Sequence, residues 1–177
     1  VYLYGEGFTE VEEVDVKSGG DLLDTDTARS YIERVRAGEF AFVFLSPPCK
    51  SFSVANLFLR HFLEPYGITP IPPEWRDYLA RHNRMALFSF EVIGAAHAAD
   101  VVWMLEHPAS RRHGPATWPA FAERASIWDL DEAIESQLLT GGVKATLAQC
   151  AYASEYQKWT TLFAARRCES FMRECLS

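Results

Sequence analysis

A cysteine and a glutamate each stand directly after an apolar run of this chain, and their types suit covalent chemistry. Cys49 follows Pro47 and Pro48, and Glu106 follows the apolar run 101–105. A thiolate is a good nucleophile near neutral pH and also leaves readily. A carboxyl group beside it can bond to a substrate and favour the addition. The two prolines have a fixed φ, which stiffens the loop and would hold the sulfur in place for attack.

The elements that must position these two residues form an α/β pattern. Continuous apolar runs at 40–45 and 101–105 predict strands that are buried on both faces. Helical stretches between such runs favour a mostly parallel sheet with flanking helices. In open α/β sheets the ligand site lies beyond the carboxyl ends of the strands. We therefore expect Cys49 and Glu106 to face one pocket, although 57 residues separate them along the chain (106 − 49).

The remaining elements are predicted from the same periodicities and from capping and turn residues. Strands are expected at 11–16, where Asp15 ends the strand, at 143–152 and at 160–165. Helices are expected at 27–37, with Asp26 as cap and Gly38 as stop, at 74–99, at 119–125 and at 168–176, whereas 127–139 stays undecided.

Three segments together resemble the DNA (cytosine-5) methyltransferases. The string Pro-Pro-Cys-x-x-Phe-Ser at 47–53 looks like the nucleophile loop of that family. The segment 106–108, Glu-His-Pro, resembles its Glu-Asn-Val or Glu-Asn-Pro motif, and the order and separation of the two also match. The segment 149–158 resembles a degenerate form of its Tyr-Gly-x-Pro-Gln-x-Arg-x-Arg segment. The resemblance covers roughly residues 11–165.

The resemblance implies a Rossmann-like, S-adenosylmethionine-dependent methyltransferase fold and methyl transfer to carbon 5 of cytosine. The family acts on a cytosine flipped out of DNA. Cys49 would add to carbon 6 of the base, and Glu106 would bond N3 and the exocyclic amine. The same chemistry serves a cytosine in RNA, so the residues leave the polymer open.

The resemblance also assigns residues to the cofactor and to the nucleic acid. Asp15 would hold the ribose hydroxyls of S-adenosylmethionine, Asp21 would meet the adenine amino group, and Pro47 would line the cofactor site. A plain turn residue is an equal alternative for Asp21. The residues expected at the nucleic acid are Ser53, Arg111, Arg112 and Lys158. Ser53 could instead cap a helix, Arg111 and Arg112 could lie in a surface loop, and Lys158 could be an ordinary surface residue.

Several positions depart from the family's pattern. Only seven residues separate Gly7 from Asp15, and a helical crossover between parallel strands needs a dozen or more. Gly5 and Gly7 are therefore predicted to lie in a turn, and the first strand with its methionine-binding loop is expected to be missing. Lys50 replaces the usual Gln, and His107 the usual Asn. We expect 1–177 to be a single, partial methyltransferase catalytic domain without a separate target-recognition domain.

Composition limits the partners. The formal net charge is −7, which argues against nucleic-acid binding through overall charge but leaves room for a local basic cleft. The four cysteines have no zinc-ligand spacing, so no metal is expected. No apolar run approaches the roughly 18 residues that a membrane span needs, and no signal peptide is visible. The sequence therefore predicts a cytoplasmic or nuclear protein without a membrane partner.

Two other functions stay open. The chain could be a catalytically degenerate methyltransferase fold that binds nucleic acid or a protein partner, since three motifs depart from the pattern. It could also be a different thiol enzyme that pairs Cys49 with a histidine such as His107, although no oriented Cys-His-Asn set is evident.

Overall fold

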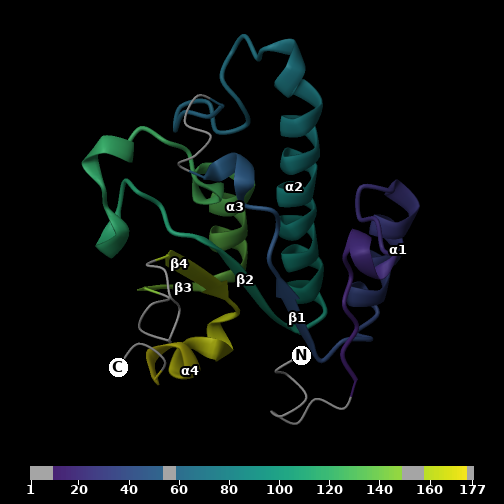
Figure 1. The fold of residues 1–177 in the computed structure, drawn as a ribbon. Coiled ribbons are helices and arrows are strands. Elements are labelled where there is room, and N and C mark those ends of the chain that lie inside the picture. Colours follow the sequence, from purple (N-terminus) through teal and green to yellow (C-terminus); the bar gives the residue numbers. More distant parts are fainter. Residues whose placement is uncertain (1–9, 54–58, 149–157, 175–177) are drawn as a thin grey trace.

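A four-stranded sheet with helices on both faces forms the centre of the protein (Figure 1). The computed structural model describes residues 10–53, 59–148 and 158–174. The strands are β1 (Phe42–Leu45), β2 (Val102–Pro108), β3 (Val143–Ala148) and β4 (Trp159–Ala164). The helices are α1 (Thr25–Arg36), α2 (Arg76–Ala98), α3 (Asp131–Thr140) and α4 (Glu169–Glu174). The predicted α/β class with flanking helices is thereby confirmed.

The sheet is mixed, with the order β1-β2-β4-β3. β1 runs parallel to β2, whereas β4 runs antiparallel to both β2 and β3. The prediction of a mostly parallel sheet is therefore wrong. Ten residues, 149–158, connect β3 to β4, and this connection is too short for the crossover that a parallel pair requires. A reversed strand of this kind is common in otherwise parallel α/β sheets.

The register of the parallel pair places two strand ends side by side. Leu45 of β1 is paired with Leu105 of β2, so the residues that follow them, Ser46 and Glu106, emerge at the same edge of the sheet. The start of the antiparallel strand β4 lies at this edge too, because Pro108 is paired with Thr160. Three segments distant in sequence thus meet where the parallel strands end.

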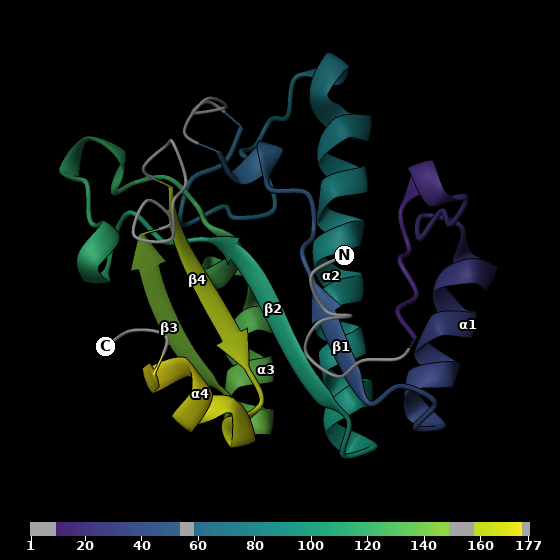
Figure 2. The same cartoon turned by 60° about the horizontal axis from the view of Figure 1, so that its bottom comes forward.

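Alternation along β2 divides its side chains between two cores. Trp103 and Leu105 face α2 and α3 and belong to the larger core. Met104 faces the other side and packs with Ala164 and with Met172 of α4. Figure 2 shows α4 in front of the sheet with α2 and α3 behind it. Both faces are covered at β2, where Trp103, Met104 and Leu105 are buried, as the run 101–105 predicted. The edge strand β1 is only partly covered, and Phe44 is 51% exposed, so the prediction that the strand at 40–45 is buried on both faces is wrong.

The helix predicted at 27–37 begins two residues earlier than expected. The carboxylate of Asp24, rather than Asp26, accepts a hydrogen bond from the backbone N–H of Thr27 at 2.8 Å and caps α1. Asp26 lies in the first turn instead, where it pairs with Arg29 at 3.1 Å. Gly38 follows the helix with φ of 73°, a left-handed conformation that suits glycine, so the predicted stop is correct.

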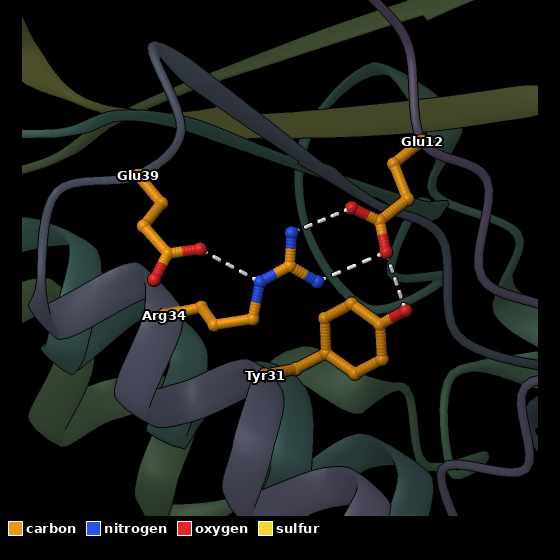
Figure 3. Close-up of polar contacts among 4 residues, drawn as sticks. All are labelled: Glu12, Tyr31, Arg34 and Glu39. Carbon is orange, nitrogen blue, oxygen red and sulfur yellow. Dashed lines mark hydrogen bonds and ion pairs between the residues drawn. The ribbon is translucent and has the colours of Figure 1, made fainter.

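The strand predicted at 11–16 is wrong. Residues 10–15 form no regular element, and Val16–Ser18 is a single 3₁₀ turn capped by Asp15. Glu12 reaches α1 instead, where its carboxylate accepts hydrogen bonds from Tyr31 at 2.6 Å and from Arg34 at 2.8 and 3.0 Å (Figure 3). Side-chain contacts with α1 therefore hold this segment, rather than backbone pairing with the sheet.

The other boundaries differ by less. The undecided stretch 127–139 is a 3₁₀ turn, Ile127–Asp129, followed by α3. The helix predicted at 119–125 is only a 3₁₀ turn, Pro119–Phe121. β3 ends at Ala148, and the rest of the strand predicted to reach residue 152 lies outside the described residues, as do residues 1–9 with Gly5 and Gly7.

Gly142 and Gly94 offer a matched test of this packing. A Cβ at Gly142 would lie 2.6 Å from Phe163 and 2.9 Å from the backbone oxygen of Ala164, so Gly142→Ala should cost about 1–3 kcal/mol through overpacking. Gly94 lies within α2 with open space around it, so Gly94→Ala should stabilise the protein by about 0.5–1 kcal/mol. Urea unfolding of both variants measures the difference, and equal stabilities would contradict the packing described.

Candidate functional site

The carboxylate of Glu106 is held at the sheet edge by groups from two other segments. The hydroxyl of Ser46, just after β1, donates a hydrogen bond to Oε2 at 2.9 Å. The ammonium of Lys158, just before β4, donates to Oε1 at 3.2 Å. The Glu106 side chain is 17% exposed, so the carboxylate is partly shielded and fixed through both oxygens. Glu106 and Lys158, both predicted site residues, are therefore in direct contact.

A cavity of about 210 Å³, here the cationic cavity, is lined by Lys158 and by His107, the residue that follows Glu106, but not by Glu106 itself. Its wall includes Cys49, Ser53, Arg111 and Lys158, four residues that the sequence predicted as functional. Arg124 also lines it, and sequence reasoning missed this residue because nothing in its local pattern marks it. Among the described residues, three cationic side chains and no carboxylate contribute to the wall. The cavity thus suits an anionic ligand, although the whole chain is acidic.

Cys49 stands at the start of a short 3₁₀ turn, Lys50–Phe52. The N–H of Phe52 donates to the carbonyl of Cys49 at 3.0 Å, and the N–H of Ser53 donates to Lys50 at 3.2 Å. Cys49 is a free thiol of intermediate exposure. The sulfur therefore belongs to a hydrogen-bonded turn that borders the cationic cavity.

A second cavity of about 370 Å³, here the acidic cavity, lies between the 12–23 segment and β1. Its wall includes all three predicted cofactor residues, Asp15, Asp21 and Pro47. Glu12 also lines it, and no Lys, Arg or His of the described ranges does so. The carboxylate of Asp15 accepts the N–H of Lys17 at 2.8 Å, and that of Asp21 accepts the N–H of Leu23 at 2.9 Å. Both aspartates thus serve as turn residues and also face a cavity of ligand-binding size.

The loop Pro47–Cys49 borders both cavities. Pro47 and Pro48 contribute to the wall of the acidic cavity, and Cys49 contributes to the wall of the cationic one. Because proline fixes φ, this stretch of backbone is stiff. A group bound in the acidic cavity and another bound in the cationic cavity would both lie next to this loop.

Arg111 and Arg112 have different surroundings. Arg111 lines the cationic cavity, and its guanidinium donates to the carbonyl of Ala116 at 3.3 Å. Arg112 does not line the cavity. Its guanidinium lies 3.7 Å from the carboxylate of Asp129 and 3.9 Å from the centre of the Phe62 ring. Arg112 therefore fixes the loop that carries Arg111.

His107 is buried, at 1% exposure, and packs edge-on against Phe52 with the ring centres 5.3 Å apart. Burial lowers its pKa to about 3, so the ring is neutral near pH 7. Within the described residues, neither ring nitrogen has a hydrogen-bond partner. The structure therefore gives no support to a Cys49–His107 catalytic pair.

Arg60 is a second group that sequence reasoning missed. It lies next to the stretch 63–73, which holds four prolines and a glycine, yet it is only 3% exposed. Its guanidinium donates to the hydroxyl of Ser51 at 2.9 Å and lies 4.0 Å from the centre of the Phe52 ring. Burial lowers the pKa of Arg60 to about 10. Local sequence carried no signal for this contact, since the partners lie eight and nine residues away.

Residues 10–53, 59–148 and 158–174 contain neither a metal-ligand cluster nor a membrane-spanning helix. No group of three or more His, Cys, Asp or Glu side chains there is arranged to hold a metal ion. None of the helices in this part is long and apolar enough to cross a membrane. The predicted segment 149–157 lies outside the described residues, so of that motif only Lys158 is placed.

Comparison with known proteins returned no relative: no protein-family model matches the chain, and neither does any curated protein or solved structure.

The contribution of Glu12 to the stability of the fold beside the acidic cavity should depend on pH. Hydrogen bonds from Arg34 and then Tyr31 lower the pKa of Glu12 from 4.5 to about 2. A depressed folded-state pKa contributes stability above the unfolded value, and this contribution is lost as the pH falls from about 4.5 through 2. Glu12→Gln should therefore lower stability at pH 7, by a small amount because solvent screens this partly exposed pair, and most of this effect should be lost by about pH 2.

Urea unfolding at the two pH values measures this effect. Glu33→Gln, an exposed position on the same helix α1, is the control. A Glu12→Gln effect of the same size at pH 2 and pH 7 would contradict the ion-pair account.

Proposed function

We propose that this chain transfers a methyl group from S-adenosylmethionine to carbon 5 of cytosine in DNA, with Cys49 as nucleophile. One observation carries the proposal: a proline-stiffened loop lines an acidic cavity with Pro47 and a cationic cavity with Cys49, while Glu106 is held between Ser46 and Lys158. A reaction that joins a cationic donor to a base on a polyanion needs two neighbouring sites of opposite charge.

Cys49 would supply the covalent step. Addition of its thiolate to carbon 6 would form an S–C6 bond and move the C5–C6 electron pair to carbon 5. Carbon 5 would then take the methyl group as the S–CH3 bond of the donor breaks and its electron pair leaves with S-adenosylhomocysteine. Loss of the C5 proton to a base returns the pair, breaks the S–C6 bond and restores the thiolate. The intermediate exposure of Cys49 leaves the sulfur open to a ligand, and a thiolate both attacks and leaves readily.

Glu106 would act on the other edge of the base. A carboxyl group that bonds N3 and the exocyclic amine draws electron density from carbon 6 and favours thiolate addition. Lys158 and Ser46 hold both oxygens of this carboxylate, so its orientation is set before the base arrives. Lys158 would therefore position Glu106 as well as contribute positive charge to the cavity.

The acidic cavity fits the cofactor in size and charge. When bound, S-adenosylmethionine supplies an electrophilic methyl group on a cationic sulfonium. The carboxylates of Asp15 and Asp21 would accept hydrogen bonds from ribose hydroxyls and the adenine amino group. Pro47 would line the cofactor cavity on the side of the loop that carries Cys49. All three residues line the same cavity, which is the support that the structure lends to these assignments.

The cationic cavity would receive the flipped nucleotide. Arg111 and Arg124 would neutralise phosphates, Ser53 would donate a hydrogen bond to one, and Arg112 would hold the Arg111 loop in place. The net charge of −7 makes binding to an arbitrary stretch of DNA weak. Binding would therefore depend on this local site.

Methyl incorporation tests the proposal. The protein is incubated with labelled S-adenosylmethionine and with DNA or RNA, and the digested nucleosides are analysed for 5-methylcytosine. Cys49→Ser should abolish incorporation, and Glu106→Gln should reduce it roughly 10²–10⁴-fold. Cys168→Ser is the control, since burial raises the pKa of that thiol and it packs near α4.

Each outcome of the methyl-incorporation experiment distinguishes the proposed function from an alternative. 5-Methylcytosine that appears in DNA and disappears with Cys49→Ser supports the proposal. Tight DNA binding without 5-methylcytosine would contradict it and favour the degenerate, binding-only function. Label in RNA alone would overturn the choice of polymer.

A further inference from the structure

Arg60 is a buried charge that no ion pair compensates within the described part of the chain. It is 3% exposed, and burial lowers its pKa to about 10, which leaves it protonated near pH 7. A buried guanidinium without a carboxylate is costly unless it is well hydrogen-bonded. The contacts that Arg60 makes must therefore account for its burial.

Those contacts converge on the nucleophile turn. One nitrogen donates to the hydroxyl of Ser51, which is itself only 1% exposed, and another donates to the carbonyl of Pro65. The guanidinium carbon lies over the Phe52 ring, 4.0 Å from the ring centre. At this distance a cation is attracted to an aromatic face. Arg60 thus ties two consecutive residues of the turn to the chain that follows it.

Phe52 connects these contacts of Arg60 to Cys49. The ring of Phe52 is held by Arg60 and, edge-on, by His107, and the ring also lines the cationic cavity. The N–H of Phe52 donates to the carbonyl of Cys49 at 3.0 Å. A shift of Phe52 would therefore move the backbone that carries the thiol and would reshape the cavity wall beside it.

We propose that Arg60 is a positioning residue that fixes the turn Lys50–Phe52, so that the Cys49 sulfur is aimed into the cationic cavity. This inference rests on the proposed function, because it assigns Arg60 a role only through Cys49. A guanidinium suits the role, since its planar fork makes directed hydrogen bonds and stacks on an aromatic ring at once, which an ammonium does less well.

The test compares two reactions of the same thiol. Adduct formation with duplex DNA that contains 5-fluorocytosine, in the presence of S-adenosylmethionine, needs an aimed sulfur. Alkylation by iodoacetamide needs only an accessible one. Arg60→Met should slow adduct formation on the order of 100-fold, because small misplacements cost that much, and should change alkylation by no more than a few-fold. Arg60→Lys should recover part of the rate.

Two further variants keep the test interpretable. Ser51→Ala removes one contact and keeps the guanidinium, so it should slow adduct formation roughly tenfold even if Arg60→Met fails to fold. Ile93→Ala, a fully buried position on α2 that lines neither cavity, controls for lost stability. All rates are compared at a temperature where each variant is folded by circular dichroism.

The outcomes are distinct. Adduct rates of Ser51→Ala and Arg60→Met that match Ile93→Ala would overturn the positioning role and leave the proposed function intact. Adduct formation and alkylation that fall in parallel would also overturn it, since access rather than aim would then be lost. Absence of any adduct with the unaltered protein would overturn the proposed function and this inference together.

Discussion

The carboxylate of Glu106 is the point on which the rest of the site depends. Its two oxygens bind Ser46 and Lys158, which follow β1 and precede β4, and Glu106 itself belongs to β2. One side chain thereby joins the ends of three strands. A partly buried carboxylate needs such partners, because an unpaired charge there would be strongly penalised. The geometry of the sheet edge and the orientation of this carboxylate are thus set by the same contacts.

The strand pairings explain why these groups meet. The parallel register of β1 and β2 brings the nucleophile loop beside Glu106, and the reversed strand β4 delivers Lys158 to the same edge. Had β4 been parallel, its first residue would lie at the opposite end of the sheet. The feature that departs from the predicted parallel sheet is therefore the one that completes the site.

Charge is distributed unevenly around that edge. The carboxylates of Glu12, Asp15 and Asp21 border one cavity, and the cations Arg111, Arg124 and Lys158 border the other. The loop with Pro47, Pro48 and Cys49 contributes to the walls of both cavities. A donor that carries positive charge and an acceptor that carries negative charge would each be attracted to its own side of the thiol. The negative net charge of the whole chain gives no indication of this separation.

Local pattern predicted what depends on neighbouring residues. The continuous apolar runs at 40–45 and 101–105 identified β1 and β2, and Gly38 marked the end of α1. The strand predicted at 11–16 failed because Glu12 pairs with Arg34, 22 residues away. The predicted direction of β4 was wrong because it depends on the length of the connection from β3. That length depends in turn on where β3 ends, at Ala148. Arg60 could not be predicted, since its burial depends on tertiary contacts with Ser51 and Phe52.

The most direct test of the central claim identifies the attached residue. The protein is trapped on DNA that contains 5-fluorocytosine with S-adenosylmethionine, digested with trypsin and nuclease, and mapped by mass spectrometry. Cleavage after Arg36 and Lys50 leaves Cys49 as the single cysteine of peptide 37–50. The account predicts that this peptide carries the methylated fluorocytosine nucleotide. A modified peptide that contains Cys168 instead, or no modified peptide at all, would contradict it.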